Sequence, residues 1–538
     1  MKLRLKSWAA FAWLAAIALL AALHALHLRA DFPNGSPWHS DWAKYTDEGW
    51  WANAAVRARL FGHWYQQGDF NPAVALPAWP ALAWLAFTVA GVSLQTARGL
   101  AVLLFVVNLV LTYLLVRARA PRWAGLLAVT LVAANPFLYC FSRLAILEPL
   151  LITFTLAALN LSVRIARFRR PAWAAATVGL LFALMMLTKT MAAFLAPALA
   201  WAMAAAMFKW QPAHILARRS ILRCALAALG TAVAVYGAWI ALVAHSGLMP
   251  DYRYLFSINL YEKPPGWNWP LTSFWWSFHG ALWVDWLLIP LAGVSILIAL
   301  DGWHAGRRTL ALDPVFGASF WAVAGSILFM TCQNHPQPRY FAVVAYFCFV
   351  MIALGAAELA SAEPGRRVLR LPAQPVRWAI IAVAVLGAGI DAARSINYAA
   401  HPQYSFVNAA AELARYVDAH PNGRPMLVSI SGDQIMLATH LPALCDDFGT
   451  EDLPEKLGRY QPGWYAAWND LDPATLQDLH TRYSLEQAAS FPAFDDKERN
   501  VLVLFKLHPL PGGAVRRIDG GQDLTQPLPD DKIDVTIE

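Results

Sequence analysis

The sequence has few charged residues and few cysteines. Charged residues make up 14% of its 538 residues, whereas a soluble domain carries about 25%. The five cysteines are scattered without the spacing of metal ligands, and Cys445 alone lies beyond residue 397. No disulfide can therefore form within that C-terminal region. The shortage of charge argues against an ordinary soluble protein.

Hydrophobic residues, in contrast, make up 58% of the chain, which also has 25 tryptophans. Apolar stretches of about 20 residues recur along it, a length that spans a bilayer as a helix. The sequence therefore predicts an α-helical polytopic membrane protein. We expect about eleven spans, near residues 8–28, 97–116, 122–140, 147–165, 172–187, 190–208, 221–245, 281–300, 314–332, 340–360 and 377–396.

The two parts of the chain carry opposite charge. Residues 398–538 contain 11 Lys and Arg against 21 Asp and Glu, a net charge of −10, and residues 1–397 contain 31 against 14, a net of +17. This asymmetry predicts a basic membrane domain over 1–397 and a soluble acidic domain over 398–538. The basic excess is explained by membrane topology, so we expect a bilayer and no nucleic acid as a partner.

The basic clusters predict the orientation of the spans. Lys and Arg gather on the cytoplasmic side of membrane proteins, and the clusters here lie at 2–6, 117–122, 164–170, 209–223, 307–308 and 366–377. They all fall inside if residues 76–93, which are short and preceded by prolines, form a juxtamembrane helix that does not cross. The first external loop is then 29–96, and the C-terminal domain lies outside. This predicts a multi-pass membrane protein with its amino terminus inside and its C-terminal domain outside.

Alternating apolar and polar stretches predict an α/β fold for the C-terminal domain. Helices are expected at 405–420, 451–460 and 473–481, and strands at 426–430, 463–468, 484–491 and 501–506. The Pro-, Gly- and Asp-rich end after about residue 508 predicts loose structure.

An adjacent acid pair, Asp47 and Glu48, follows the first span. Acids at a membrane edge are costly unless they stay hydrated or do chemistry. The pair begins a predicted amphipathic helix. One alternative is that Thr46 or Asp47 only caps that helix.

Further unusual polar residues fall at the predicted outer ends of spans: Arg143, Glu148, Lys189, Arg339 and Tyr340. Each has a structural alternative, since Arg143 and Glu148 can form a local ion pair and Lys189 can extend toward the interface. Together they place acids and cations on one membrane face. A carboxylate there can remove a proton from an attacking hydroxyl, and cations can stabilise a leaving group that gains negative charge.

The motifs that contain these polar residues resemble those of a known family. Residues 47–52 (Asp-Glu-Gly-Trp-Trp-Ala) resemble the first-loop signature of the GT-C glycosyltransferases, in the branch with glycosyltransferase family 39 (protein O-mannosyltransferases) and lipid A aminoarabinose transferases. Residues 143–149, 187–189 and 338–340 resemble later motifs of that branch, in order. The chain departs from them at Trp51, where the family often has Tyr, and at Glu148, where it often has Asp.

The resemblance implies a membrane transferase that moves a sugar from a polyprenyl-phosphate donor to an extracytoplasmic hydroxyl of a protein, lipid or glycan. It implies Asp47 as the catalytic acid/base residue and Glu148 as the acid of the second loop. From their chemistry and placement we expect Glu48 to act beside these two acids, and Arg143, Lys189, Arg339 and Tyr340 to bind substrate. Asp47 and Glu148 are the only candidate ligands for a divalent metal ion. The alternative function is a transporter or lipid flippase of envelope glycan assembly, which would place polar groups near the bilayer midplane.

Overall fold

The computed structural model describes residues 7–210, 214–257, 269–307, 310–332, 337–363 and 365–510. Within these ranges, six helices are long and apolar enough to cross a membrane, or eight if each of two bent helix pairs is one span. Shorter apolar helices occupy the predicted spans at 8–28, 147–165 and 172–187. A helix therefore lies in each predicted span, and the number of crossings, eleven, stays a prediction.

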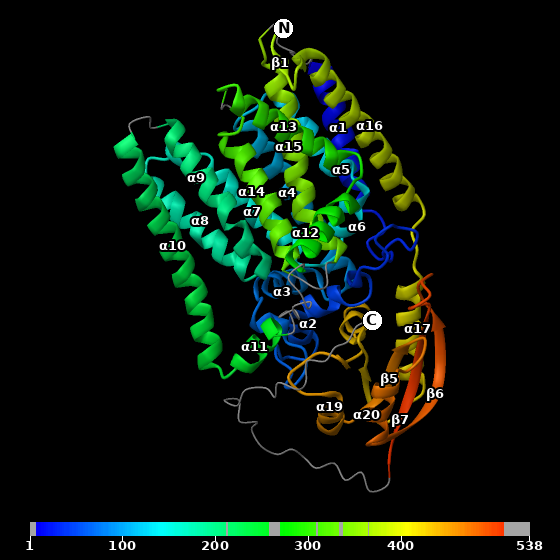
Figure 1. Cartoon of the computed structure of the whole chain (residues 1–538). Coiled ribbons are helices and arrows are strands. Elements are labelled where there is room, and N and C mark those ends of the chain that lie inside the picture. The colour runs from blue at the N-terminus through cyan, green and yellow to red at the C-terminus, as the bar shows by residue number, and fades with distance from the viewer. Residues whose placement is uncertain are drawn as a thin grey trace.

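The helices of the membrane part form one bundle (Figure 1). Their bounds are α1 Ser7–Leu23, α4 Leu94–Arg117, α5 Arg122–Ala134, α6 Pro136–Ser142, α7 Glu148–Ser162, α8 Pro171–Met186, α9 Ala196–Trp210, α10 His214–His245, α12 Trp269–Gly280, α13 Leu288–His304, α14 Pro314–Thr331, α15 Ala342–Ala360 and α16 Ala373–Ala400. Helix α15 is buried along almost its whole length at the centre, whereas α10 packs on α8 at one edge.

Prolines define where several of these helices begin. Proline fixes φ and lacks an N–H, so it suits the first turn of a helix and disfavours helical backbone in the residue before it. Asn135 accordingly leaves the helical region before Pro136, and α5 and α6 meet there at 68°. Prolines also stand in the first turn of α7, α8, α14 and the short helix η6 (Pro338–Phe341).

Short helices fill the loops between the spans. They are η1 Trp42–Lys44, α2 Asp47–Leu60, η2 Pro72–Val74, α3 Ala78–Ala90, η3 Ile165–Arg167, η4 Thr190–Leu195, α11 Met249–Ser257 and η5 Ala281–Trp283, with a small hairpin β1 Arg367–Val368 and β2 Leu371–Pro372. Helix α3 is 13 residues long, about 20 Å against a hydrocarbon core of about 30 Å. This length agrees with the prediction that residues 76–93 do not cross.

The C-terminal region has the predicted mixed α/β composition. Its elements are α17 Ser405–Ala419, β3 Arg424–Val428, α18 Gly432–Thr439, β4 Ala443–Leu444, α19 Leu453–Tyr460, β5 Pro462–Trp468, α20 Pro473–His480, β6 Tyr483–Pro492 and β7 Val501–Pro509. The five strands form one sheet in the order β4-β3-β5-β7-β6. Strands β4, β3 and β5 are parallel, whereas β7 is antiparallel to β5 and β6. All seven predicted elements are confirmed, and α18 and β4 were not predicted. The expected loose end beyond residue 510 lies outside the described residues.

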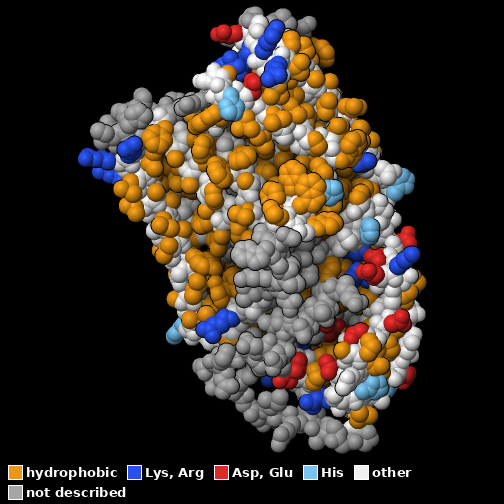
Figure 2. Space-filling model, in the orientation of Figure 1, with side chains coloured by type: hydrophobic (Ala, Val, Ile, Leu, Met, Phe, Trp, Pro, Cys, Tyr) orange, Lys and Arg blue, Asp and Glu red, His pale blue; other side chains and the backbone are white. Residues whose placement is uncertain are grey.

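The two parts of the chain differ in surface character. Hydrophobic side chains form a broad belt over the helical bundle, and Asp and Glu gather over the C-terminal region (Figure 2). Helix α2 lies between the two parts (Figure 1), packed against α3 on one side and α18 on the other. The predicted helix after Asp47 is present, and α18 covers its polar side, so that Glu48, Asn53 and Arg57 are all buried.

Candidate active site

Four segments that are distant in the sequence bring their polar residues together. Asp47 is the first residue of α2 and Glu148 the first residue of α7. Lys189 directly precedes η4, and Arg339 lies in η6. Each residue thus stands where a loop enters a helix, and all four are buried.

The first half of this cluster is an ion-paired arrangement around Arg339. Its Nη2 lies 2.7 Å from Oδ2 of Asp47, and its Nη1 pairs with the carboxylate of Asp41. The Asp41 carboxylate also accepts a hydrogen bond of 2.9 Å from the backbone N–H of Arg339. Asp47 accepts two further hydrogen bonds, from the Trp51 indole at 3.1 Å and the Thr46 hydroxyl at 3.1 Å. One guanidinium therefore bridges two carboxylates from the segment between α1 and α3.

The second half joins Glu148 to Lys189. The Lys189 ammonium donates to Oε1 of Glu148 and lies 3.8 Å from the centroid of the Tyr340 ring. Arg339 lies over the same ring, with its Cζ 5.0 Å from the centroid. Tyr340 thus stands between the two cations, and its π face is attractive to both. Neither structural alternative describes these residues: Lys189 is buried and paired, and the partner of Glu148 is Lys189 and not Arg143.

Burial controls the protonation of this cluster. It raises the pKa of the Asp47 carboxyl, an effect that the Arg339 guanidinium opposes and the Asp41 carboxylate reinforces. Burial also lowers the pKa of the Lys189 ammonium, which the Glu148 carboxylate opposes. Desolvation disfavours the charged form of each group. Asp47 therefore holds a proton more readily than an exposed aspartate does.

The donor set does not fit a divalent metal ion. Among the described residues, no three His, Cys, Asp or Glu side chains form a group that could hold a metal. Asp47 and Glu148 each pair with a fixed cationic side chain, and a metal ion between them would meet Arg339 and Lys189 at close range.

Glu48 lies outside this cluster, although it is adjacent to Asp47. Its two carboxylate oxygens accept from Arg98 at 2.7 and 2.5 Å, from the Ala145 backbone at 2.8 Å and from Gln434 at 3.1 Å. The side chain is buried with four hydrogen bonds. This arrangement links α2, α4, the turn before α7 and α18, so Glu48 has the contacts of a structural residue.

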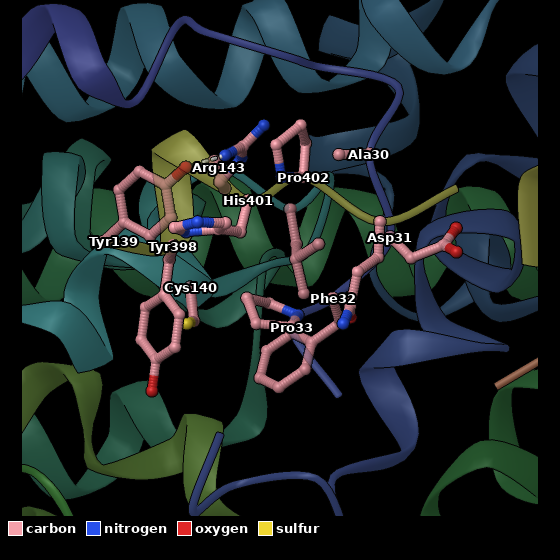
Figure 3. A pocket seen from close by; sticks show the side chains of 12 residues that line it. Ala30, Asp31, Phe32, Pro33, Tyr139, Cys140, Arg143, Tyr398, His401 and Pro402 are labelled. Atoms are coloured by element: carbon pink, nitrogen blue, oxygen red, sulfur yellow. Dashed lines mark hydrogen bonds between the residues drawn. The ribbon is translucent and has the colours of Figure 1, made fainter. Parts of the chain in front are cut away.

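Arg143 also lies apart from the other cations. Its guanidinium donates to the backbone carbonyls of Leu26 and His27 at 2.6 and 2.5 Å and to the Tyr139 hydroxyl. It lines a small cavity of about 20 Å³ between the first loop and the end of α16, together with Asp31 and His401 (Figure 3). Such a cavity has room for about one water molecule.

Sequence reasoning missed two residues that complete these networks, Asp41 and Arg98. Asp41 lies six residues before Asp47 in the loop that was predicted to be external, so a list of every acid in that loop would have included it. Arg98 lies at the outer end of a predicted span, and the signal that drew attention to Arg339, an arginine on the side where the positive-inside rule disfavours it, applies equally to Arg98.

Comparison with known proteins supports the resemblance. Residues 72–243 match the family model described as dolichyl-phosphate-mannose-protein mannosyltransferase. ArnT from Cupriavidus metallidurans in the apo state superposes with a TM-score of 0.60 at 15% identity, covering 92% of this chain and 98% of that one. The chain has the fold of the GT-C glycosyltransferases. The resemblance predicted from the motifs is thereby confirmed.

Two further solved structures share the fold. ArnT from the same organism bound to undecaprenyl phosphate gives a TM-score of 0.56 at 14% identity over 92% of this chain and 97% of that one. The oligosaccharyltransferase of Archaeoglobus fulgidus, tethered to an acceptor peptide, gives 0.50 at 14% identity over 89% and 69%. No curated protein matches the chain by sequence. The matched family segment contains Glu148 and Lys189, whereas Asp47 and Arg339 lie outside it.

An apolar cavity of about 360 Å³ begins beside α2. Residues of α2, α3, α10 and the loop before α3 line it, among them Ala54, Trp64, Pro77 and Trp239. Ala54 follows Asp47 by seven residues, which is two helical turns and about 10 Å along the axis. The two residues therefore lie on the same side of α2.

Proposed function

We propose that this protein is a membrane glycosyltransferase that moves one sugar from a polyprenyl-phosphate donor to a hydroxyl group of an extracytoplasmic acceptor. The observation that carries the proposal is the buried cluster of Asp47, Glu148, Lys189 and Arg339, in which two carboxylates and two cations from four segments meet. These are the groups that transfer to a hydroxyl from a phosphate leaving group requires.

Asp47 is the base in this proposal. The acceptor oxygen forms a bond to the anomeric carbon while the bond from that carbon to the donor phosphate breaks. The acceptor proton passes to the Asp47 carboxylate, and the electron pair of the broken bond stays on the phosphate. A positioned carboxylate contributes about 10²–10⁴-fold to such a step. Glu148 holds Lys189 in place and orients the acceptor.

Lys189 and Arg339 bind the donor phosphate. The phosphate of the donor carries one negative charge and gains a second as the glycosidic bond breaks, so fixed cations stabilise the transition state more than the ground state. Both cations pair with acids here, and the donor phosphate would compete with those carboxylates. Asp47, released from Arg339, would then be free to accept the proton.

The apolar cavity supports a lipid-linked substrate. A polyprenyl chain is long and apolar, and a cavity lined mainly by apolar side chains begins on the Asp47 side of α2. Apolar surface that leaves water on binding contributes about 25 cal/mol per Å². The ArnT structure that binds undecaprenyl phosphate has the same fold, which supports a carrier of this class.

The position of the cluster favours transfer over transport. Transporters place substrate sites near the bilayer midplane on interrupted helices. The two bent helix pairs of this structure, α5 with α6 and Leu271–Trp283 with Leu288–His304, contribute none of the four cluster residues. Those residues lie at loop–helix junctions beside the C-terminal region. We propose that this side is extracytoplasmic, in a bacterial inner membrane, with 1–397 as catalytic domain and 398–538 as external domain.

Incubation of the purified protein with radiolabelled polyprenyl-phosphate sugars and cell-envelope fractions tests the proposal. We expect label to move from the lipid to an acceptor, with release of polyprenyl phosphate in equal amount. Labelled donor that crosses the membrane of a sealed vesicle without loss of its sugar would instead show a flippase.

A further inference from the structure

Helix α2, which begins with Asp47, lacks a cap of its own. The first N–H groups of a helix have no partner within it, and the residue before the helix usually supplies a side-chain oxygen. Thr46 stands at that position but makes no capping hydrogen bond. Its hydroxyl donates instead to the Trp42 carbonyl at 3.0 Å and to Asp47 at 3.1 Å. The alternative that Thr46 or Asp47 caps the helix is therefore not met: Thr46 makes no capping bond, and Asp47 is already the first helical residue.

Gln434 of α18 supplies the missing cap from the C-terminal region. Its Oε1 accepts a hydrogen bond of 2.7 Å from the backbone N–H of Gly49, in the first turn of α2. Its Nε2 donates to Glu48 at 3.1 Å. Gln434 is buried, so both bonds are shielded from water. One amide from residue 434 thus binds the two residues that follow Asp47.

The close approach of α18 explains why residue 49 is a glycine. A Cβ at Gly49 would lie 2.1 Å from the backbone nitrogen of Gln434 and 2.5 Å from its Cα. No side chain fits there unless the two helices separate. The small residue in the Asp-Glu-Gly motif therefore allows contact with the C-terminal region.

The same contact continues along α2. Asn53 donates to Asp433 at 2.8 Å, and Arg57 pairs with Asp433 at 3.0 Å. Gly49, Asn53 and Arg57 follow one another at four-residue intervals, so they line one side of the helix. Asp47 is two residues from Gly49, about 200° around the axis, and faces the opposite side. Contacts with α18 therefore fix the rotation of α2 that points Asp47 at Arg339.

Asp31 of the membrane part in turn caps α17, a helix of the C-terminal region. Asp31, from the first external loop, accepts from the backbone N–H groups of Phe406 and Val407 at 2.8 and 3.2 Å and from the Ser405 hydroxyl at 3.1 Å. These are the first residues of α17, which also has no side-chain cap at its own N-cap residue, Tyr404. Each part of the chain thus completes a helix of the other.

We infer that Gln434 is a positioning residue for catalysis: by capping α2 from the C-terminal region, it sets the location and rotation of Asp47. The inference rests on the proposed role of Asp47 as the base. Gln434 also holds Glu48, which accepts from the Ala145 N–H three residues before Glu148. The amide is therefore connected to both segments that bring carboxylates to the cluster.

The test compares Gln434→Met, which keeps the side-chain length and removes both hydrogen bonds, with Leu457→Ala. Leu457 is fully buried in the C-terminal core, away from α2, so its variant reports the effect of lost stability alone. Single-turnover rate and donor affinity are measured separately, well below the melting temperature of each variant. Hydrogen exchange of the peptide that contains residues 46–50 is followed in the same samples.

We expect Gln434→Met to lower the single-turnover rate about 10- to 100-fold, because a displacement of about 1 Å can cost 10²-fold. Donor affinity should change less than twofold, and residues 46–50 should exchange faster than in Leu457→Ala. The inference is overturned if Gln434→Met keeps the wild-type rate, or loses no more rate than Leu457→Ala does.

An Asp47→Asn variant in the same series separates the two claims. If it loses transfer while Gln434→Met does not, the positioning role alone is wrong. If it transfers at the wild-type rate, the proposed base is wrong, and the inference about Gln434 fails with it.

Discussion

Asp47 and Glu48 are adjacent, both acidic and both buried, yet they belong to two different regions. Asp47 faces the membrane part, where it shares Arg339 with Asp41. Glu48 faces α4 and α18: its oxygens accept two hydrogen bonds from Arg98, one from the Ala145 backbone and one from Gln434 of the C-terminal region. One residue step around a helix is about 100°, and that step separates the two environments.

The difference shows what each environment is suited to do. The Glu48 carboxylate has a bidentate arginine and two further donors, the strong geometry of a permanent ion pair. Asp47 shares its partner, Arg339, with Asp41. This suits the proposal that the donor phosphate displaces the Asp47 carboxylate from Arg339. A fully satisfied charge stabilises the fold, whereas a shared one is available for chemistry.

The largest effect is expected from Asp47→Asn. The amide keeps the shape of the side chain but cannot accept the acceptor proton, so the single-turnover rate should fall about 10²–10⁴-fold. Expression and melting temperature should stay close to those of Asp418→Asn, a matched change at an exposed site of α17. Near-normal turnover would remove Asp47 from the mechanism.

Glu48→Gln should act on stability more than on chemistry. It leaves the buried Arg98 guanidinium without a counter-charge, and breaking a buried ion pair in this way costs about 3–5 kcal/mol. We expect a large drop in melting temperature in detergent, with Glu412→Gln, in an exposed pair with Arg415, as the unaffected control. A stable Glu48→Gln protein that has lost transfer would give Glu48 a catalytic role after all.

Charge removal at Lys189 and Arg339, the two cations proposed to bind the donor phosphate, should have a smaller effect on the single-turnover rate. Lys189→Met and Arg339→Gln are each expected to lower the single-turnover rate about 10²-fold, the cost of removing one group that stabilises developing charge, and to weaken donor binding. Arg415→Gln, at an exposed site, is the control. Unchanged rate and affinity in both variants would show that the two cations serve structure alone.

Thiol labelling shows on which side of the membrane the C-terminal region lies. With Glu412→Cys in a Cys332→Ser background, a membrane-impermeant maleimide should label intact spheroplasts as completely as lysed ones, because Glu412 is exposed and the region is predicted to lie outside. Labelling after lysis alone would place residues 398–538 in the cytoplasm and reverse the topology.

Local patterns in the sequence were enough to predict most of the fold. Apolar runs predicted where helices lie, and alternation predicted strands such as β6 and β7, because these depend on each segment's own residues. Helix α18 was missed although it is as long as α19 and α20, because its start lacks the Asp cap and first-turn Pro that those two helices have. The packing of α18 on α2 depends on residues about 380 positions apart, which no local pattern reports.

The candidate site was predicted in part for the same reason. Polar residues at span ends drew attention to Asp47, Glu148, Lys189 and Arg339, and the structure brings these four together. Glu48 was grouped with them because it is adjacent in sequence, but helix geometry turns it away. The sequence indicates which residues are unusual, and only the fold shows which of them meet.

The pH dependence of the single-turnover rate, compared between the wild type and Asp47→Asn, tests the central claim most directly. Burial raises the pKa of Asp47, and only the deprotonated carboxylate can act as the base. The wild-type rate should therefore fall on acidification at a higher pH than the ordinary aspartate pKa of about 3.9. The residual rate of Asp47→Asn should show no such fall. The same acidic limb in both proteins would contradict the account, because another group would then be the base.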